Sequence, residues 1–101
     1  MSGNVYFIFD PFNHLVKIGK ANEPHQRLNQ LKHELDLPLD LLAIIPNASH
    51  GLEKILHKRF KQYKARRDDG NYREWFYPKA DIVDWMTKNA QLFFPPSYNK
   101  K

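Results

Sequence analysis

The chain has 101 residues, 42% of them hydrophobic, and a formal net charge of +5 with a pI near 9.5. This length supports a single core, and the apolar content is too high for a disordered chain. The absence of cysteine excludes disulfides and thiolate metal sites. No apolar run approaches the roughly 20 residues of a membrane span, and no basic region precedes the apolar N-terminal run. We therefore expect a cytoplasmic protein that meets no membrane, and the excess of cations favours a polyanionic partner.

Three strands and a helix are expected in the first half of the chain. Residues 4–9 and 15–19 are rich in β-branched and aromatic residues and flank the polar stretch 10–14, which is typical of a hairpin. Residues 39–45 form a third apolar run that ends at a proline. Pro24 suits the first turn of a helix. The core-facing residues of that helix follow at helical spacing: Leu28, Leu31 and Leu35.

The second half predicts two more helices and a short extended segment. One helix is expected to begin between Asn47 and Ser49, either of which could cap it. A polar loop, residues 64–73, separates it from the extended segment 74–77, and residues 79–89 have the pattern of another helix. The apolar stripe of the earlier helix comprises Leu52, Ile55, Leu56, Phe60 and Tyr63.

The order strand, strand, helix, strand, helix, strand, helix indicates an α+β fold. We expect a small, mostly antiparallel sheet of three to four strands flanked by helices. Residues 1–92 are assigned to one domain and residues 93–101 to a C-terminal tail.

A concentrated basic segment follows the third strand. It contains seven Lys or Arg residues and no acid, with aromatic residues interleaved and following. A solvated helix face is one interpretation of such a run. Because stacking surfaces lie nearby, we favour nucleic-acid binding. The basic residues are Lys54, Lys58, Arg59, Lys61, Lys64, Arg66 and Arg67.

Two charged side chains are expected at the rim of the core. At ~100° per residue, Arg27 lies roughly 70° from the centre of its helix's apolar stripe, and Glu53 lies roughly 80–90° from the centre of its own. Arg27 could instead pair with Glu23 on the surface, and Glu53 could be an ordinary carboxylate at a helix boundary. Tyr6, in the middle of a strand, could be a half-buried sheet aromatic.

Five short motifs in this order resemble those of the GIY-YIG nuclease superfamily, in particular its small phage-type branch with KIG and EWF signatures. They are Asn4-Val5-Tyr6, Lys17-Ile18-Gly19, the helix residue Arg27, Glu53 within LEKILHKRF, and Glu74-Trp75-Phe76. The resemblance covers about residues 5–76. Lys17 stands where the second tyrosine of the family name occurs.

The resemblance implies a divalent-metal-dependent endonuclease that hydrolyses DNA phosphodiester bonds. Tyr6 would orient or deprotonate the attacking water, with Lys17 and Lys20 favouring the phenolate. Arg27 would contact the scissile phosphate, and Glu53 would hold Mg²⁺ or Mn²⁺. Lys17 would add electrostatic support as the fourth catalytic residue.

Further residues are assigned to DNA contact or to the structure of the motifs. Gly19 permits a close backbone approach, and Glu74 is expected to pair with Arg73 or with a helix lysine, although it could replace Glu53 as the metal ligand. Trp75 and Phe76 complete the structural motif. The residues expected to contact nucleic acid are Lys20, His33, Lys54, His57, Lys58, Lys61, Lys64, Arg66, Arg67 and Arg73.

Alternatives remain for the metal and for the function. His50, Glu53 and His57 could bind zinc, although positions i and i+7 are two helical turns apart. The fold could serve as a catalytically inactive nucleic-acid-binding module, an alternative motivated by Lys17, or as a domain that binds an acidic protein. The sequence leaves monomer and homodimer open.

Overall fold

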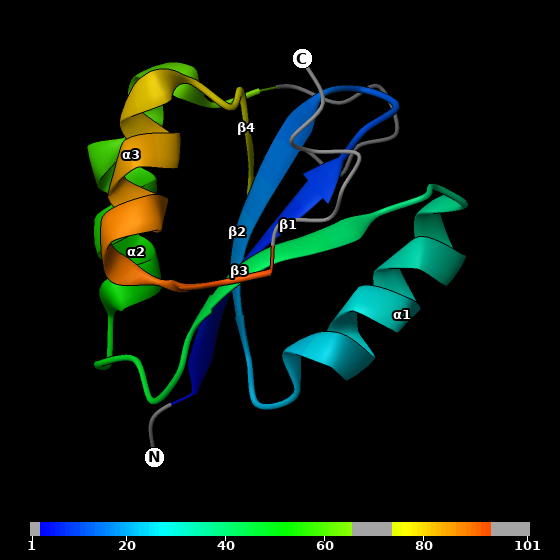
Figure 1. Cartoon of the computed structure of the whole chain (residues 1–101), viewed down its shortest axis with the longest axis horizontal. Helices are drawn as coiled ribbons and strands as arrows, with labels where there is room; N and C mark the ends of the chain where they lie inside the picture. The colour runs from blue at the N-terminus through cyan, green and yellow to red at the C-terminus, as the bar shows by residue number, and fades with distance from the viewer. Residues whose placement is uncertain (1–2, 66–73, 94–101) are drawn as a thin grey trace.

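The computed structural model describes residues 3–65 and 74–93, in which a five-stranded sheet forms the centre. The strands run in the order β4-β2-β1-β3-β5, and every neighbouring pair is antiparallel (Figure 1). The prediction of three to four strands was therefore wrong by one, because a two-residue strand is too short to show an alternating pattern. The bounds are Asn4–Asp10 for β1, Leu15–Ala21 for β2, Asp40–Ile45 for β3, Trp75–Phe76 for β4 and Gln91–Leu92 for β5.

Helices cover both faces of the sheet. Helix α1 (Pro24–Leu35) packs on one face, and α2 (Leu52–Arg59) and α3 (Ala80–Asn89) lie together on the other (Figure 1). A short 3-10 turn, Lys61–Tyr63, follows α2. None of the helices in the described part of the chain has the length and apolar character needed to cross a membrane.

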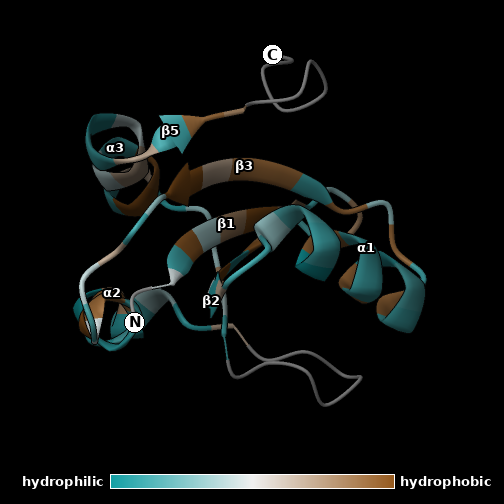
Figure 2. Cartoon of the chain, turned by 90° about the horizontal axis from the view of Figure 1, so that it is seen from below, coloured by the Kyte–Doolittle hydropathy of each residue, from teal (hydrophilic) through white to brown (hydrophobic). Residues whose placement is uncertain are grey.

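Strand β1 is apolar on both sides because both of its faces are covered. Val5, Phe7 and Phe9 pack toward α2 and α3, whereas Tyr6 and Ile8 pack toward α1. Figure 2 shows this contrast, with hydrophobic brown along β1 and β3 and hydrophilic teal over most of α1. The sheet therefore carries one hydrophobic cluster on each face.

A register shift changes the alternation in β3. Pairing with β1 shifts between Phe7 and Ile8, which are opposite Ala43 and Leu41 respectively. The consecutive residues Leu42 and Ala43 thus both belong to the cluster beneath α2 and α3. A β-bulge of this kind is what allows two neighbouring residues to serve the same face of a sheet.

Two predictions for α2 were wrong. The helix begins at Leu52 after Gly51, whose φ of 90° is left-handed, and no side chain caps it. The residues before it are tied to the N-terminal strand instead, since the Ala48 N–H donates to the Gly3 carbonyl at 2.8 Å. Ile55, placed in the apolar stripe, is 59% exposed because the helix buries only a narrow line of residues through Leu56.

Among residues 3–65 and 74–93, strand β4 covers only part of the outer edge of β2. It pairs only with Val16 and Lys17. Beyond it, the Ile18 N–H donates to the Glu74 carbonyl at 3.0 Å, and the Ile18 carbonyl lies 2.7 Å from Nε2 of His57. This edge is where side chains from opposite faces of the sheet can approach one another.

Candidate active site

Tyr6 lies flat across the neighbouring strand. It is 2% exposed and is opposite Gly19 in the β1–β2 register. A Cβ atom on Gly19 would overlap the Tyr6 ring at Cζ and the hydroxyl. Glycine at this position therefore makes room for the tyrosine, which is a more specific role than the close backbone approach expected from the sequence.

The surroundings of the Tyr6 hydroxyl keep it protonated. Burial raises the pKa of Tyr6 from 10.0 to about 12, the Glu74 and Glu53 carboxylates add to the rise, and the Arg27 guanidinium opposes it. The sequence predicted the reverse, with Lys17 and Lys20 favouring the phenolate. Desolvation outweighs the cations because the ring is enclosed in the sheet.

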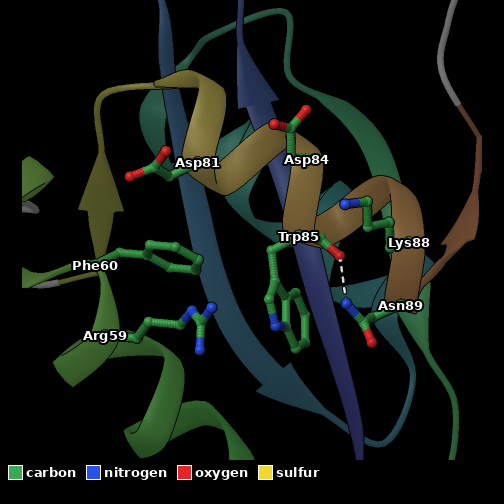
Figure 3. A pocket seen from close by; sticks show the side chains of 7 residues that line it. All are labelled: Arg59, Phe60, Asp81, Asp84, Trp85, Lys88 and Asn89. Atoms are coloured by element: carbon green, nitrogen blue, oxygen red, sulfur yellow. Dashed lines mark hydrogen bonds between the residues drawn. The ribbon is translucent and has the colours of Figure 1, made fainter.

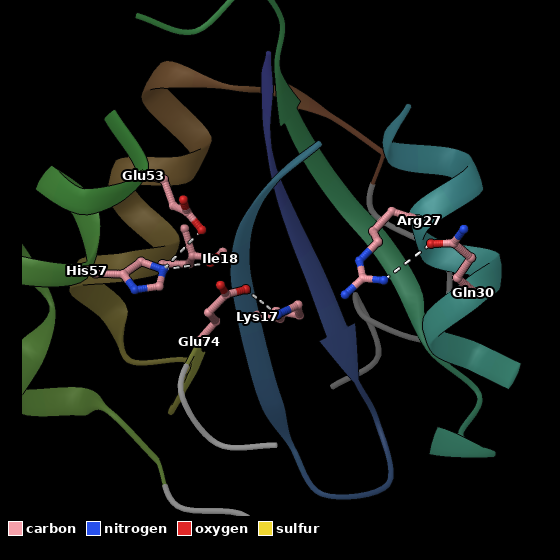
Figure 4. Close-up of polar contacts among 7 residues, drawn as sticks. All are labelled: Lys17, Ile18, Arg27, Gln30, Glu53, His57 and Glu74. Atoms are coloured by element: carbon pink, nitrogen blue, oxygen red, sulfur yellow. Dashed lines mark hydrogen bonds and ion pairs between the residues drawn. The ribbon is translucent and has the colours of Figure 1, made fainter. Parts of the chain in front are cut away.

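Arg27 approaches the tyrosine from α1. The side chain is half-buried, and its Nη1 donates to Oε1 of Gln30 at 3.2 Å. In Figure 4 it points from α1 toward the sheet. The alternative of a surface ion pair with Glu23 is not what the structure has, because the two ion pairs among the described residues are made by other side chains. The remaining donors of its planar guanidinium can bind an anion.

Glu53 enters the site from the first turn of α2, on the opposite face of the sheet. Its Oε2 is 3.9 Å from Nε2 of His57. Because a carbonyl oxygen only accepts, the contact between His57 and Ile18 places the proton of His57 on Nε2. The His57 ring also packs edge-on against Phe76, with centroids 5.1 Å apart. These contacts fix the imidazole beside the carboxylate.

Lys17 of β2 and Glu74, the residue before β4, form an ion pair. Lys17 is 7% exposed, and its ammonium also lies 5.9 Å from the centre of the Trp75 ring. The partner of Glu74 is therefore a strand lysine rather than the helix lysine expected from the sequence, and Arg73 lies outside the described residues. A buried lysine requires such a counter-ion, because an unpaired buried charge is strongly destabilising.

The two glutamates share one surface cavity of about 300 Å³. Burial raises the pKa of the Glu53 carboxyl above its usual value, and the negative charge of Glu74 adds to this rise. Figure 4 shows Glu53, His57 and Glu74 on one side of β2 and Arg27 on the other. The cavity is lined by Glu53, Lys54, His57, Lys64 and Glu74.

The donor set fits a hard, largely hydrated cation better than a fully protein-bound one. The described residues contain no group of three or more His, Asp or Glu side chains that could hold a metal ion, so His50, Glu53 and His57 do not form the zinc site considered from the sequence. Mg²⁺ and Mn²⁺ are often bound through one carboxylate, waters and substrate phosphates. Glu53, whose charge is incompletely neutralised, suits that mode.

The residues predicted to contact nucleic acid fall into three groups. His57 is half-buried beside Glu53 on α2. His33 is exposed and lies on a different helix, in the last turn of α1. Arg66, Arg67 and Arg73 lie outside the described residues. The exposed cations at the end of β2 and on or just after α2 are Lys20, Lys54, Lys58, Lys61 and Lys64.

Glu74 lies closer to the chemistry of the site than its sequence context predicted. It was expected to tie a loop to the sheet, yet its charge acts on Tyr6 and Glu53 and its side chain lines the cavity. One available signal was the position of Glu74 directly before the apolar pair Trp75-Phe76. A strand that short places the preceding residue at its edge, where a side chain can reach across to the neighbouring strand.

Comparison with known proteins gives one family. The model of the T5orf172 domain matches residues 3–90, most of the chain, and this phage-type domain is associated with nuclease and GIY-YIG-like folds. Searches of curated proteins and of solved structures gave no match to this chain.

Because Tyr6 lies so close to Gly19, adding one methyl group at position 19 should destabilise the folded protein. We expect Gly19→Ala to lower the free energy of unfolding by about 1–3 kcal/mol, the usual cost of overpacking. In a Tyr6→Leu background, which lacks the ring, the same change should cost clearly less. Gly3→Ala is the control, since its new Cβ would meet the flexible stem of Lys20. Urea unfolding of the five proteins measures the coupling, and equal costs in both backgrounds would contradict the contact.

The enclosed tyrosine predicts a pH dependence at alkaline pH. Between pH 10.0 and about 12 the folded state retains the Tyr6 proton that the unfolded chain has lost, so stability decreases as the pH rises through this range. Ultraviolet titration of the wild type minus Tyr6→Phe should show one tyrosine ionising near pH 12. Glu74→Gln should lower that pKa, because the Glu74 charge raises it. Ionisation of Tyr6 near pH 10 in the folded protein would show that the hydroxyl is not enclosed.

Proposed function

The chain belongs to the T5orf172 domain family, and from this premise we propose that it is a divalent-metal-dependent endonuclease of the GIY-YIG type that acts on DNA. One observation carries the proposal. The Tyr6 hydroxyl is influenced by Arg27 from α1, by Glu53 from α2 and by Glu74 beside β4. A hydroxyl to orient water, a guanidinium for the phosphate and a carboxylate for a metal ion, from three separate elements, can together support phosphodiester hydrolysis.

Arg27 is assigned to the scissile phosphate. Its contact with Gln30 uses one donor and leaves the rest of its fork for two phosphate oxygens. Negative charge increases on these oxygens as the phosphorus becomes pentavalent, so a fixed cation stabilises the transition state more than the ground state. Arg27 thereby serves as both clamp and electrostatic catalyst.

Tyr6 is assigned to the attacking water. With its pKa at about 12, it is a neutral phenol at pH 7, so its hydroxyl accepts a hydrogen bond from the water and orients it. The water oxygen forms a bond to phosphorus while the bond to the leaving sugar oxygen breaks, and the proton that the water releases passes through solvent to the leaving oxygen. Neutralising Glu53 and Glu74 would lower the Tyr6 pKa and so increase the fraction of phenolate, the form that can accept the proton of the water.

Glu53 is assigned to the metal. A bound Mg²⁺ or Mn²⁺ would supply the positive charge that the phosphate oxygens need during hydrolysis. His57 lies beside Glu53 at 3.9 Å, and its own ring is fixed by Ile18 and Phe76. Lys17 remains an electrostatic support, which neutralises Glu74 and keeps the site from accumulating negative charge.

A second function is a nucleic-acid-binding module without catalysis. Its supporting observation is that Lys17, in the position of the second motif tyrosine, is held by Glu74 and so is not free to contact substrate. Both functions need the exposed cations near α2, and they differ only in whether the Tyr6, Arg27 and Glu53 cluster cuts DNA. A variant that separates cleavage from binding therefore decides between them.

Arg27→Ala provides that separation. If Arg27 acts mainly on the transition state, cleavage of plasmid DNA with Mg²⁺ should fall at least about 10²-fold, while DNA affinity falls only a few-fold. Arg27→Lys, which keeps the charge and loses the fork, should recover only part of the rate. Lys32→Ala, at an exposed position on the same helix, is the control. Parallel loss of binding and cleavage would argue against a transition-state role.

The exposed cations predict strong salt dependence. Binding of duplex DNA should weaken with a slope of roughly −4 to −6 in a plot of log affinity against log salt, because each neutralised phosphate releases about one counterion. The double variant Lys58→Gln, Lys61→Gln should reduce the magnitude of the slope by about 2, whereas Lys32→Gln should not change it. A flat response in the wild type would exclude α2 as the DNA-binding face.

A further inference from the structure

A second hollow, of about 470 Å³, lies between the end of α2 and the outer side of α3. It contains an indole, two cations and two carboxylates, and none of these groups belongs to the cluster around Tyr6. Figure 3 shows the guanidinium of Arg59 directed toward the indole of Trp85, with Lys88 on the far side. Its charged and indole side chains are those of Arg59, Asp81, Asp84, Trp85 and Lys88.

Trp85 offers a stacking surface on a rigid support. Its ring is half-buried and packs against Phe7 of the sheet, with centroids 6.3 Å apart and planes 37° from parallel. Its backbone carbonyl accepts a hydrogen bond from the Asn89 side chain at 2.8 Å. The part of the indole that the core does not cover lines the hollow. A fixed aromatic ring next to cations is the usual platform for an unpaired base.

The hollow has two cations and two carboxylates, and one of the carboxylates already has a hydrogen-bond partner. Asp81 accepts a hydrogen bond from the Tyr63 hydroxyl at 2.6 Å. Arg59 and Lys88 are exposed, and in the described parts of the chain the ion pairs lie elsewhere, at Glu74 and Glu53. Arg59 and Lys88 are therefore the groups that can bind a phosphate against the charge of the two aspartates, and Asp84 can accept a further hydrogen bond. The hollow can therefore accept one phosphate and still present a carboxylate to an amino group.

The hollow is connected to the active site around α2. At ~100° per residue, Glu53 and Arg59 lie roughly 120° apart, on opposite flanks of the buried side of the helix. Lys54 and Lys58 occupy the exposed side between them. A helix is about 10–12 Å across with its side chains, so the path of about 240° around its exposed side is roughly 20–25 Å long, or about six or seven steps of a DNA strand. A single strand could follow these lysines from Glu53 to Arg59.

We propose that this hollow binds one unpaired nucleotide of the DNA strand that occupies the active site. The base stacks on Trp85, its phosphate contacts Arg59 and Lys88, and Asp84 accepts a hydrogen bond from an exocyclic amino group such as that of cytosine. The inference rests on the nucleic-acid binding of the proposed function. It assigns as the substrate class DNA whose cut strand is single-stranded for about six or seven nucleotides on one side of the cut.

The test compares single-stranded and duplex binding in EDTA, where cleavage plays no part. The probes are a labelled oligo(dC) strand of about 12 nucleotides and a duplex of equal length, within the usual size of such sites. Titration with the single strand should quench tryptophan fluorescence in the wild type. The quenching should be lost in Trp85→Phe, because the remaining Trp75 is 2% exposed. Trp85→Ala should weaken single-strand affinity about tenfold and duplex affinity less than twofold.

Two substitutions of exposed lysines test the same site even if Trp85→Ala does not fold. Lys88→Gln, at an exposed position, should weaken single-strand binding about threefold, whereas Lys79→Gln, at an exposed lysine outside the hollow, should leave it unchanged. Absence of quenching, or equal losses on single-stranded and duplex DNA, would overturn the proposal. So would equal effects of the two lysine variants.

The outcome is separable from that of the endonuclease proposal. A protein that does not cut DNA but shows Trp85-dependent quenching would retain the nucleotide site and lose the catalytic assignment. A protein that cuts DNA but shows no selective effect of Trp85 or Lys88 would retain the catalytic site and lose the nucleotide site.

Discussion

The contact between Tyr6 and Gly19 is the constraint on which the site depends. Because the ring crosses the neighbouring strand, its hydroxyl is carried from the centre of the sheet toward the open edge of β2. Any side chain at position 19 would displace the ring, and a shift of one residue in register would turn the tyrosine to the other face. The hydroxyl of Tyr6 therefore reaches its position only if the β1–β2 register is kept and residue 19 is glycine.

That open edge explains how opposite faces of the sheet contribute to one site. Arg27 comes from the α1 face and Glu53 from the α2 face, and the short strand β4 covers too little of β2 to separate them. The ion pair between Lys17 and Glu74 lies at the point of this edge where β4 begins. Burial and the charge of Glu74 disfavour the ionised form of Glu53, so a divalent cation that arrives with substrate would relieve this cost.

The sequence predicted the parts of the fold that local patterns determine. The hairpin, the helix start at Pro24 and the third helix followed from apolar periodicity and turn residues, and all are present. The fifth strand and the exposure of Ile55 did not, because both depend on which elements meet in three dimensions. Helical angles placed Arg27 and Glu53 at the rim of the core, where both are half-buried. The sequence could not predict the direction of the Tyr6 pKa shift, because the shift comes mainly from burial, which depends on the packing of the whole domain.

The most direct test of the central claim is nicking of supercoiled plasmid by the wild type and by Glu53→Gln, each with Mg²⁺, Mn²⁺ or EDTA. The account predicts nicking by the wild type with either metal, none in EDTA, and none by Glu53→Gln. It also predicts that Glu53→Gln retains the fold, since it removes a carboxylate whose ionisation burial disfavours. Metal-dependent nicking by a folded Glu53→Gln protein would contradict the account and transfer the metal-binding role to another residue, with Glu74 the first to examine.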